Sequence, residues 1–177
     1  MTDEVHDRIR DYWDRDSHTY DETRSHSISD PLEAAAWRQA LADALPEPGT
    51  KVLDVGAGTG ALSLLAAELG YEVTALDLSP GMLGRAELKA KERGLDERML
   101  FVVGSGTEPP EGPFDAVMER HVLWTLPDPV GSLTRWREVS SRLVLFEGIW
   151  GENDLRRRAK ALAAGWLRKV MSVPDEH

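Results

Sequence analysis

Short apolar runs alternate with helical patterns along the middle of the chain. The runs predict five strands, at residues 51–55, 72–77, 99–103, 114–118 and 142–146. Between several of them apolar residues recur at helical spacing, and glycines or Asp-Pro and Ser-Pro pairs mark the helix ends. Strands that alternate with helices predict an α/β fold, a doubly wound, mostly parallel sheet with helices on both faces. Ligands in such sheets bind beyond the carboxyl ends of the strands.

The flanks of this alternating region read as helical. The segment 12–16 has a helical pattern, 17–29 is polar and loop-like, and Asp30-Pro31 is a helix start with an N-cap acceptor and proline in the first turn. Trp37, Leu41 and Leu45 then fall on one face of the predicted helix. The last segment carries apolar residues at helical spacing, namely Leu155, Ala159, Leu162, Trp166 and Val170.

Composition narrows the class of protein. The 177 residues contain no cysteine, which excludes disulfides and thiolate chemistry, and no apolar run long enough to span a bilayer. The acidic N-terminus lacks a secretory signal, so we expect a cytoplasmic protein. A net charge of −10 would repel a polyanion, which argues against nucleic acid as a partner. We interpret the basic cluster Arg156, Arg157, Arg158 and Lys160 as a solvated helix face.

The glycine-rich segment VLDVGAGTG at 52–60 is the strongest local signal. It follows a predicted strand and opens a helix, so its backbone can turn sharply and approach a ligand. Gly56, Gly58 and Ala61 also fit the dinucleotide pattern loosely. Asp54 favours a different ligand, because a carboxylate there would repel a pyrophosphate but suit a ligand that carries an ammonium and a sulfonium. The alternative is that Asp54 only accepts hydrogen bonds from the loop.

Asp77 ends the second predicted strand, in the segment ALDLS at 75–79. An acidic residue at this place can accept hydrogen bonds from both ribose hydroxyls. Nucleotides and adenosyl ligands share this feature, so Asp77 indicates a ribose without naming the cofactor. The alternative is a negative charge that only stabilises the N-terminus of the helix after Ser79.

Four segments together resemble the class I, Rossmann-like S-adenosylmethionine-dependent methyltransferases of the small-molecule type. They are VLDVGAGTG at 52–60, ALDLSPGML at 75–83, FVVGSG at 101–106 and FDAVMERHVLWTLPDP at 114–129. The stretch YWDRDSHTYDE at 12–22 is similar to the lid that precedes the core in these proteins. The resemblance implies S-adenosylmethionine as cofactor and methyl transfer to an oxygen, nitrogen or carbon atom of a small molecule.

The resemblance also implies roles for single residues. Asp54, Gly56 and Gly58 would hold the methionine end of the cofactor, Asp77 the ribose, and Leu78 and Met82 the adenine. The cofactor-binding positions implied in this way are Tyr12, Tyr20, Asp54, Gly56, Ala57, Gly58, Asp77, Leu78, Met82, Ser105, Gly106 and Arg120.

The chain departs from the family pattern in three places. In the family, the position of Ser105 more often holds an acidic residue. Only Ser140 and Ser141 connect the last core helix to the strand that follows it. The family's usual sixth and seventh strands have no candidate in this sequence. We expect one domain, with residues 1–50 as a helical lid, 51–150 as the cofactor-binding core and 151–177 as a C-terminal helix. The missing strands indicate a minimal or incomplete chain, or a sheet edge that a partner, such as a second copy in a homo-oligomer, would cover.

The candidate catalytic residue is His121, at the carboxyl end of the fourth strand, where it could take a proton near neutral pH; packing or capping is the alternative. His18 and His26 are weaker candidates in the polar loop. Trp124 and Trp150 would line a substrate pocket, whereas Trp136 and Trp166 sit at helical spacing and are expected in the core. No metal site is expected. Two other functions stay open, a non-methylating adenosyl-cofactor-binding protein and an NAD-dependent oxidoreductase.

Overall fold

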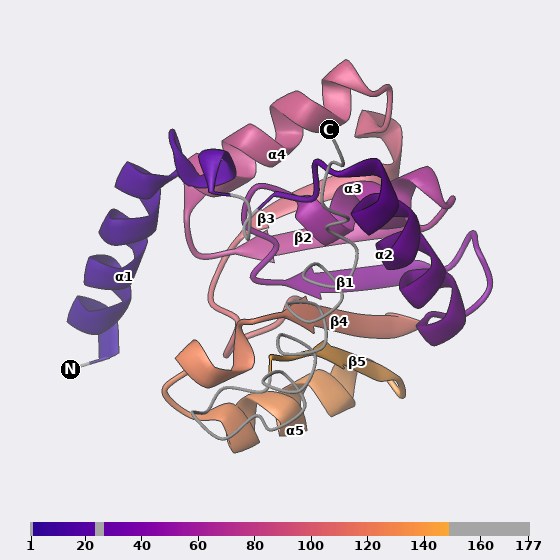
Figure 1. The fold of residues 1–177 in the computed structure, drawn as a ribbon. Coiled ribbons are helices and arrows are strands. Elements are labelled where there is room, and N and C mark those ends of the chain that lie inside the picture. Colours follow the sequence, from indigo (N-terminus) through magenta and orange to yellow (C-terminus); the bar gives the residue numbers. More distant parts are fainter. Residues whose placement is uncertain (1, 24–26, 149–177) are drawn as a thin grey trace, which may run out of the picture. The chain divides into compact units, whose positions relative to one another are not determined.

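The computed structural model describes residues 2–23 and 27–148 (Figure 1). Within them a five-stranded sheet is built from β1 (Lys51–Val55), β2 (Glu72–Asp77), β3 (Met99–Val103), β4 (Ala116–Arg120) and β5 (Leu143–Phe146). The order is β3-β2-β1-β4-β5, and every neighbouring pair is parallel. The chain therefore winds outward from β1 to β3 and then crosses to β4, which confirms the doubly wound parallel sheet. The crossing makes the carboxyl ends of β1 and β4 the switch point where such sheets bind ligands.

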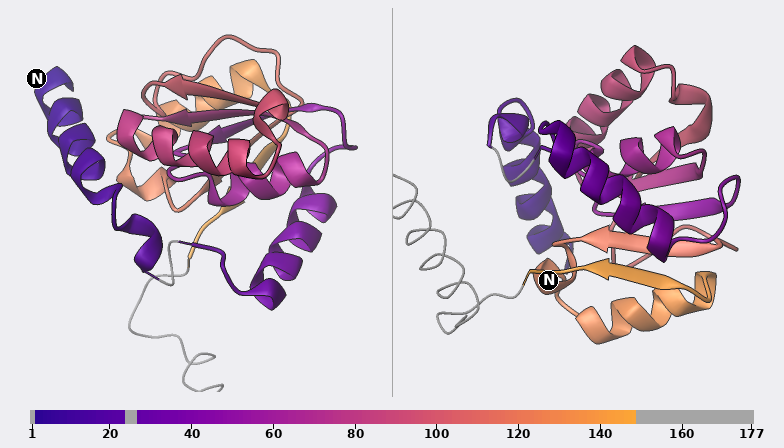
Figure 2. Two further views of the ribbon diagram at one scale, coloured as in Figure 1. Left: turned by 90° about the horizontal axis from the view of Figure 1, so that it is seen from above. Right: turned by 45° about the vertical axis from the view of Figure 1, so that its right-hand side comes forward.

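Helices cover both faces of the sheet. On one face lie α2 (Pro31–Ala44), α3 (Ala61–Glu68) and α4 (Pro80–Glu92), and on the other lies α5 (Pro129–Val139), as the two views of Figure 2 show. One buried cluster joins Leu41 of α2 and Leu65 of α3 to the strands, and a second places the fully buried Trp136 of α5 against the opposite face. Alternate side chains of each strand thus point into different cores.

Three helices begin as the sequence predicts. At the start of α2, the Asp30 side chain accepts a hydrogen bond from the backbone N–H of Leu32 at 2.7 Å. At the start of α4, the Ser79 hydroxyl accepts one from the backbone N–H of Met82 at 3.0 Å. At the start of α5, the Asp128 carboxylate accepts one from the backbone N–H of Gly131 at 2.9 Å. A proline follows each of the three caps, where its missing N–H costs nothing. These caps fix where α4 and α5 start, at the ligand-binding edge of the sheet.

The predicted bounds of the fourth strand were wrong. β4 covers Ala116–Arg120 and not 114–118. The Asp115 carboxylate accepts a hydrogen bond from the backbone N–H of Lys51, the first residue of β1, at 2.8 Å. The pairing between β1 and β4 therefore begins one residue later on each strand, at Val52 and Ala116. Phe114 instead forms an isolated bridge with Ser140.

The N-terminal segment contains more helix than predicted. α1 covers Thr2–Asp16, and a short 3-10 turn, η1 (Tyr20–Glu22), lies in the segment expected to be a loop. Two further 3-10 turns are η2 (Asp96–Arg98) and η3 (Leu123–Thr125). The chain divides into a compact unit over Met1–Glu147 and a second unit from Gly148. The predicted C-terminal helix, Trp150, Trp166, His26 and the basic cluster at 156–160 lie outside the described residues. No helix in the described part is both long and apolar enough to cross a membrane.

Candidate active site

The glycine-rich loop connects β1 to α3 at the switch point of the sheet. Gly56, Gly58 and Gly60 all have positive φ angles, of 67°, 55° and 84°. A Cβ atom on Gly56 would stand 2.2 Å from Cγ2 of Val122, so close packing excludes any side chain there. A Cβ atom on Gly58 would meet nothing within 4 Å. The loop therefore packs against the β4 side through Gly56 and leaves open space at Gly58.

A cavity of about 340 Å³, including its open mouth, lies beside this loop. The structure brings together here six of the residues predicted to bind cofactor, Tyr20, Asp54, Gly56, Ala57, Gly58 and Arg120. Thr59, Ala61 and Leu62 also line the cavity and were not predicted, although Thr59 lies inside the glycine segment. The lining thus comes from the N-terminal segment, β1, the loop, the first turn of α3 and the end of β4.

Asp54 is buried at the base of this cavity. Its Oδ2 accepts a hydrogen bond from the Ser63 hydroxyl of α3 at 2.5 Å. Burial raises the pKa of the Asp54 carboxyl to about 7, although the Ser63 hydrogen bond and the nearby positive charge of Arg120 both act to lower it. Asp54 therefore changes charge near neutral pH, and a cationic ligand group in the cavity would favour its ionised form.

Asp77 holds the loop to the next helix. Its Oδ2 accepts from the Gly58 N–H at 2.8 Å and its Oδ1 accepts from the Ser79 N–H at 2.9 Å. Burial raises the pKa of Asp77, although these backbone hydrogen bonds act to lower it. Asp77 is not part of the cavity lining, nor are Leu78 and Met82, and Met82 is buried in the core.

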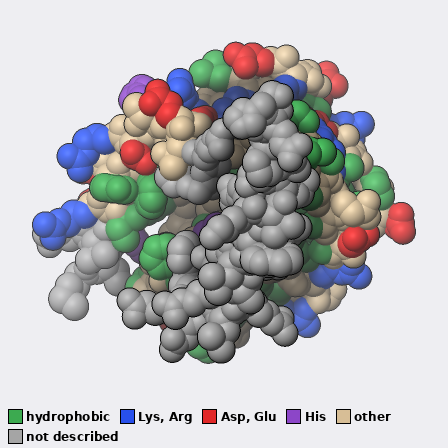
Figure 3. Space-filling view, viewed as in Figure 1, with side chains coloured by type: hydrophobic (Ala, Val, Ile, Leu, Met, Phe, Trp, Pro, Cys, Tyr) green, Lys and Arg blue, Asp and Glu red, His purple; other side chains and the backbone are tan. Residues whose placement is uncertain are grey.

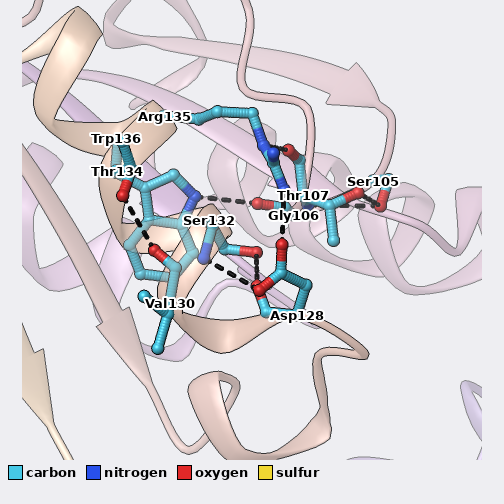
Figure 4. Close-up of polar contacts among 10 residues, drawn as sticks. Ser105, Gly106, Thr107, Asp128, Val130, Ser132, Thr134, Arg135 and Trp136 are labelled. Carbon is cyan, nitrogen blue, oxygen red and sulfur yellow. Dashed lines mark hydrogen bonds and ion pairs between the residues drawn. The ribbon is translucent and has the colours of Figure 1, made fainter.

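The loop after β3 is anchored to α5 and lies outside the cavity lining (Figure 4). The Ser105 hydroxyl pairs with that of Thr107 at 2.8 Å, and the Gly106 carbonyl accepts from Nε1 of Trp136 at 2.8 Å. A Cβ atom on Gly106 would stand 2.9 Å from Cγ1 of Val55. Ser105 and Gly106, predicted at the adenine edge, thus hold the loop in place, and Trp136 is buried in the core as expected.

Two carboxylates fasten the N-terminal segment to the core. Asp21 of η1 accepts from the Thr59 hydroxyl at 2.6 Å and lies 2.6 Å from Nζ of Lys89 in α4. Burial acts to raise the pKa of Asp21, but the hydrogen bonds from Lys89 and Thr59 outweigh it and the pKa is lowered. Asp14 of α1 accepts from the Gly81 N–H at 2.9 Å and from the Ser79 hydroxyl, at the start of α4. We call Asp14 and Asp21 with these partners the N-terminal latch.

The latch places Tyr20 in the cavity lining, with its ring edge-on to that of Trp13 at 5.9 Å between centroids. Burial raises the pKa of the Tyr20 hydroxyl, so it stays a neutral donor. Tyr12, also predicted to close the site, is 57% exposed and outside the lining. Sequence reasoning missed Asp14 and Asp21, because their partners lie far along the chain.

The carboxyl ends of β4 and β5 carry the remaining candidates. His121 follows β4 with a φ of 63°, and its Nδ1 lies 3.6 Å from Oε2 of Glu147, just beyond β5. Glu119, near the end of β4, is fully buried. Trp124, predicted to line a substrate pocket, is 65% exposed in η3 and outside the cavity lining. His18, the weaker candidate, is exposed, and its carbonyl accepts from Arg85.

These residues fit an adenosyl ligand better than a dinucleotide. The open space at Gly58 lets a ligand approach the backbone, and the buried Asp54 in the lining favours a positive group and disfavours a pyrophosphate. Asp77 stands at the end of the neighbouring strand, where ribose hydroxyls are bound in such sheets.

Comparison with known proteins agrees with this interpretation. The methyltransferase domain family matches residues 53–142, which is just over half of the 177 residues. The chain belongs to this family. The matched span begins inside β1, ends one residue before β5 and contains the whole loop between β1 and α3. The family implies S-adenosylmethionine as the cofactor.

Two similar proteins are an aklanonic acid methyltransferase from a Streptomyces species, 40% identical over 98 residues, and a ubiquinone biosynthesis O-methyltransferase from Xanthomonas campestris, 42% identical over 101 residues. These matches cover 53% and 56% of this chain, and 44% and 39% of the relatives, so the chain spans less than half of their length. The solved magnesium protoporphyrin IX methyltransferase of Synechocystis with bound S-adenosylmethionine shares the fold, at a TM-score of 0.62 and 23% identity over 79% of this chain and 74% of that one.

Proposed function

We propose that this methyltransferase-family chain transfers a methyl group from S-adenosylmethionine to an oxygen, nitrogen or carbon atom of a small molecule. The observation that carries the proposal is the cavity at the switch point, where the glycine loop, Asp54 and Arg120 meet inside the family match. Both curated relatives described above are named as methyltransferases of small molecules, which supports the substrate class.

Each cofactor contact follows from charge and shape. Asp54 offers a negative charge to the ammonium and sulfonium end, Gly58 leaves room for the approach, and Asp77 offers a carboxylate to the ribose. Bound S-adenosylmethionine supplies an already activated methyl group, so the protein mainly orients the reactants and excludes water. Tyr20, held by the N-terminal latch, closes the cavity from the side of the proposed lid. The adenine contacts of Leu78, Met82, Ser105 and Gly106, and the closing role of Tyr12, stay predictions.

The proposed acceptor site lies at the ends of β4 and β5, next to Arg120. His121 is the proposed proton acceptor for a hydroxyl or a protonated nitrogen. Trp124 remains a proposed wall of the acceptor pocket, and the same prediction for Trp150 lies outside the described residues. Acidic and basic side chains are interspersed over the described part of the face in Figure 3, which supports a small molecule and not a polyanion as the partner. A cytoplasmic location and a homo-oligomer that covers the sheet edge are also part of the proposal.

Incubation with S-adenosylmethionine that carries a labelled methyl group, and a panel of phenols, carboxylic acids and amines, tests this function. We expect at least one acceptor to gain one labelled methyl group, detected by mass spectrometry, and His121→Ala to lower that rate about 10²–10⁴-fold for a hydroxyl acceptor. Cofactor binding without transfer to any acceptor would favour the non-methylating adenosyl-binding protein. Binding of NADH with indifference to S-adenosylmethionine would favour the oxidoreductase, which the buried Asp54 opposes.

A further inference from the structure

The end of β4 holds His121 in a backbone conformation that side chains rarely adopt. Among the described residues other than glycine, it alone has a positive φ, of 63°. Such a conformation is strained for a residue with a side chain and persists only where the surrounding structure enforces it. The His121 N–H donates to the carbonyl of Phe146 at 3.2 Å, which ties this turn to the end of β5.

Glu119 stabilises the other side of the same turn. Its Oε2 accepts the backbone N–H groups of Val122 at 2.8 Å and Leu123 at 3.3 Å, directly after His121. Its Oε1 is the one buried side-chain polar atom in the described part of the chain that has no hydrogen-bond partner. A buried carboxylate with an unpartnered oxygen costs free energy, and structural capping alone could be achieved more cheaply at the surface.

Glu147 faces the His121 ring from the neighbouring strand. The register pairs Arg120 with Phe146, so the next residue on each strand, His121 and Glu147, project from the same edge of the sheet. Nδ1 of His121 is 3.6 Å from Oε2 of Glu147, the separation of an ion pair and slightly longer than a hydrogen bond. In the described part of the chain, the charged groups near His121 include Glu119, Arg120 and Glu147, and Asp54 lies farther along the same edge of the sheet.

We propose that Glu147 and Glu119 are positioning residues for His121 as the proton acceptor of the reaction. Glu119 fixes the turn that presents the ring, and the Glu147 carboxylate favours a proton on Nδ1, which leaves Nε2 as the basic nitrogen. In the reaction, an acceptor hydroxyl loses its proton to Nε2, and the acceptor oxygen forms the bond to the methyl carbon. The sulfur keeps the electron pair of the broken carbon–sulfur bond. The Glu147 carboxylate offsets the charge of the resulting imidazolium.

This inference rests on the proposed function but can be tested without cofactor or acceptor. Nitrogen-15 NMR of labelled histidine in the folded, cofactor-free protein, at a pH where the rings are neutral, distinguishes the two ring tautomers. We expect His121 to carry its proton on Nδ1, Glu147→Ala to shift the population to Nε2–H, and Glu147→Gln to lie between them. The matched control is Glu138→Ala, a glutamate exposed on α5, which should change nothing.

A second readout is the rate at which diethyl pyrocarbonate acylates His121, measured by mass spectrometry with the exposed His18 as internal reference. Loss of the facing charge in Glu147→Gln, which keeps the side chain's shape, should slow the reaction about two- to fivefold, as expected for a partly exposed pair. A parent protein with His121 in the Nε2–H tautomer, or a Glu147→Ala variant identical to the parent in both readouts, would overturn the role of Glu147.

Glu119→Gln and Glu119→Ala test the turn. Glutamine keeps an acceptor for the N–H groups of Val122 and Leu123, so Glu119→Gln should retain the parent tautomer of His121. Glu119→Ala should lose that tautomer, and the amide hydrogens of Val122 and Leu123 should exchange with solvent at least about tenfold faster. Unchanged exchange and tautomer in Glu119→Ala would contradict the role of Glu119. If the alanine variant does not fold, loss of the parent tautomer in the folded Glu119→Gln variant contradicts it instead. Calorimetry of the parent with S-adenosylmethionine reports on the proposed function independently, because neither NMR nor acylation needs the cofactor.

Discussion

Gly56 and Gly58 share a left-handed backbone but are required for different physical reasons. At Gly56 a side chain would collide with Val122, so the requirement comes from packing within the protein. At Gly58 there is open space, so the reasons for a glycine are the left-handed backbone and, in our proposal, the approach of the cofactor. A stability measurement alone cannot separate these cases, but a comparison of stability with binding can.

Gly58→Val and Gly94→Val make that comparison. Gly94 follows α4 with a φ of 65°, close to the 55° of Gly58, and a Cβ atom at either glycine would meet nothing within 4 Å. Gly94 differs in place, because it stands at the opposite end of α4 from the cavity. We expect both variants to lose about 1–2 kcal/mol of folding free energy, from the left-handed strain. Only Gly58→Val should lose S-adenosylmethionine binding, measured by calorimetry on the folded proteins. Equal affinity of Gly58→Val and the parent would mean that the loop does not face the cofactor.

At the scale of the elements, the N-terminal latch connects α1 to the start of α4 and η1 to the glycine loop. Asp14 accepts from the first turn of α4, which begins after the Asp77 position, and Asp21 accepts from Thr59 in the glycine loop. Movement of the N-terminal segment would therefore break the hydrogen bond between Asp21 and Thr59, a residue that lines the cavity. This coupling makes the segment suited to a lid whose position depends on the cofactor.

Asp14→Ala should release α1 from the core. The variant removes the acceptor for the Gly81 N–H and the Ser79 hydroxyl, so the amides of α1 and of the first turn of α4 should exchange with deuterium several-fold faster, as expected for lost local hydrogen bonds. The central strands should exchange as in the parent. The control is Asp11→Ala, an exposed residue of the same helix whose side chain pairs only with Arg10 among the described residues. Unchanged exchange in Asp14→Ala would remove Asp14 from the latch.

The sequence predicts the elements well where the signal is local, and poorly where side chains meet across elements. β1, β2 and β3 have the predicted bounds because each is a short apolar run between turn residues. β4 is displaced because the Asp115 carboxylate, at the start of β1, decides where the ladder begins. The contact between His121 and Glu147 follows from strand register, which apolar periodicity does not fix until the strand order is known.

At the scale of the whole molecule, three buried carboxyl groups among the described residues oppose folding at neutral and higher pH. Burial raises the pKa of Asp54 to about 7 and also raises the pKa values of Asp77 and Glu119. A carboxyl group whose pKa is raised in the folded state binds a proton more tightly there than in the unfolded chain. Its stabilising contribution is therefore present at low pH and is lost as pH rises through the folded-state value.

Asp54→Asn should remove the part of this pH dependence that Asp54 contributes. For Asp54 the loss runs from about pH 4 to about pH 7 and reaches about 4 kcal/mol at most. Asparagine keeps an acceptor for the Ser63 hydroxyl without a charge, so the variant should be more stable than the parent at about pH 8 and similar at about pH 4. Denaturant unfolding of both proteins across this range checks it, with the exposed Asp43→Asn as control. A parent more stable than Asp54→Asn at about pH 8 would contradict the buried charge.

The most direct test of the central claim is calorimetric titration of the parent with S-adenosylmethionine at about pH 6 and about pH 8. A cationic ligand end beside Asp54 favours the ionised carboxylate, so binding should release a proton and become tighter with rising pH across the pKa of about 7. The released proton appears as a dependence of the observed heat on the ionisation enthalpy of the buffer, and Asp54→Asn should lose it. Saturable binding that strengthens with pH is the predicted result. A folded parent protein that binds no S-adenosylmethionine at either pH would contradict the account.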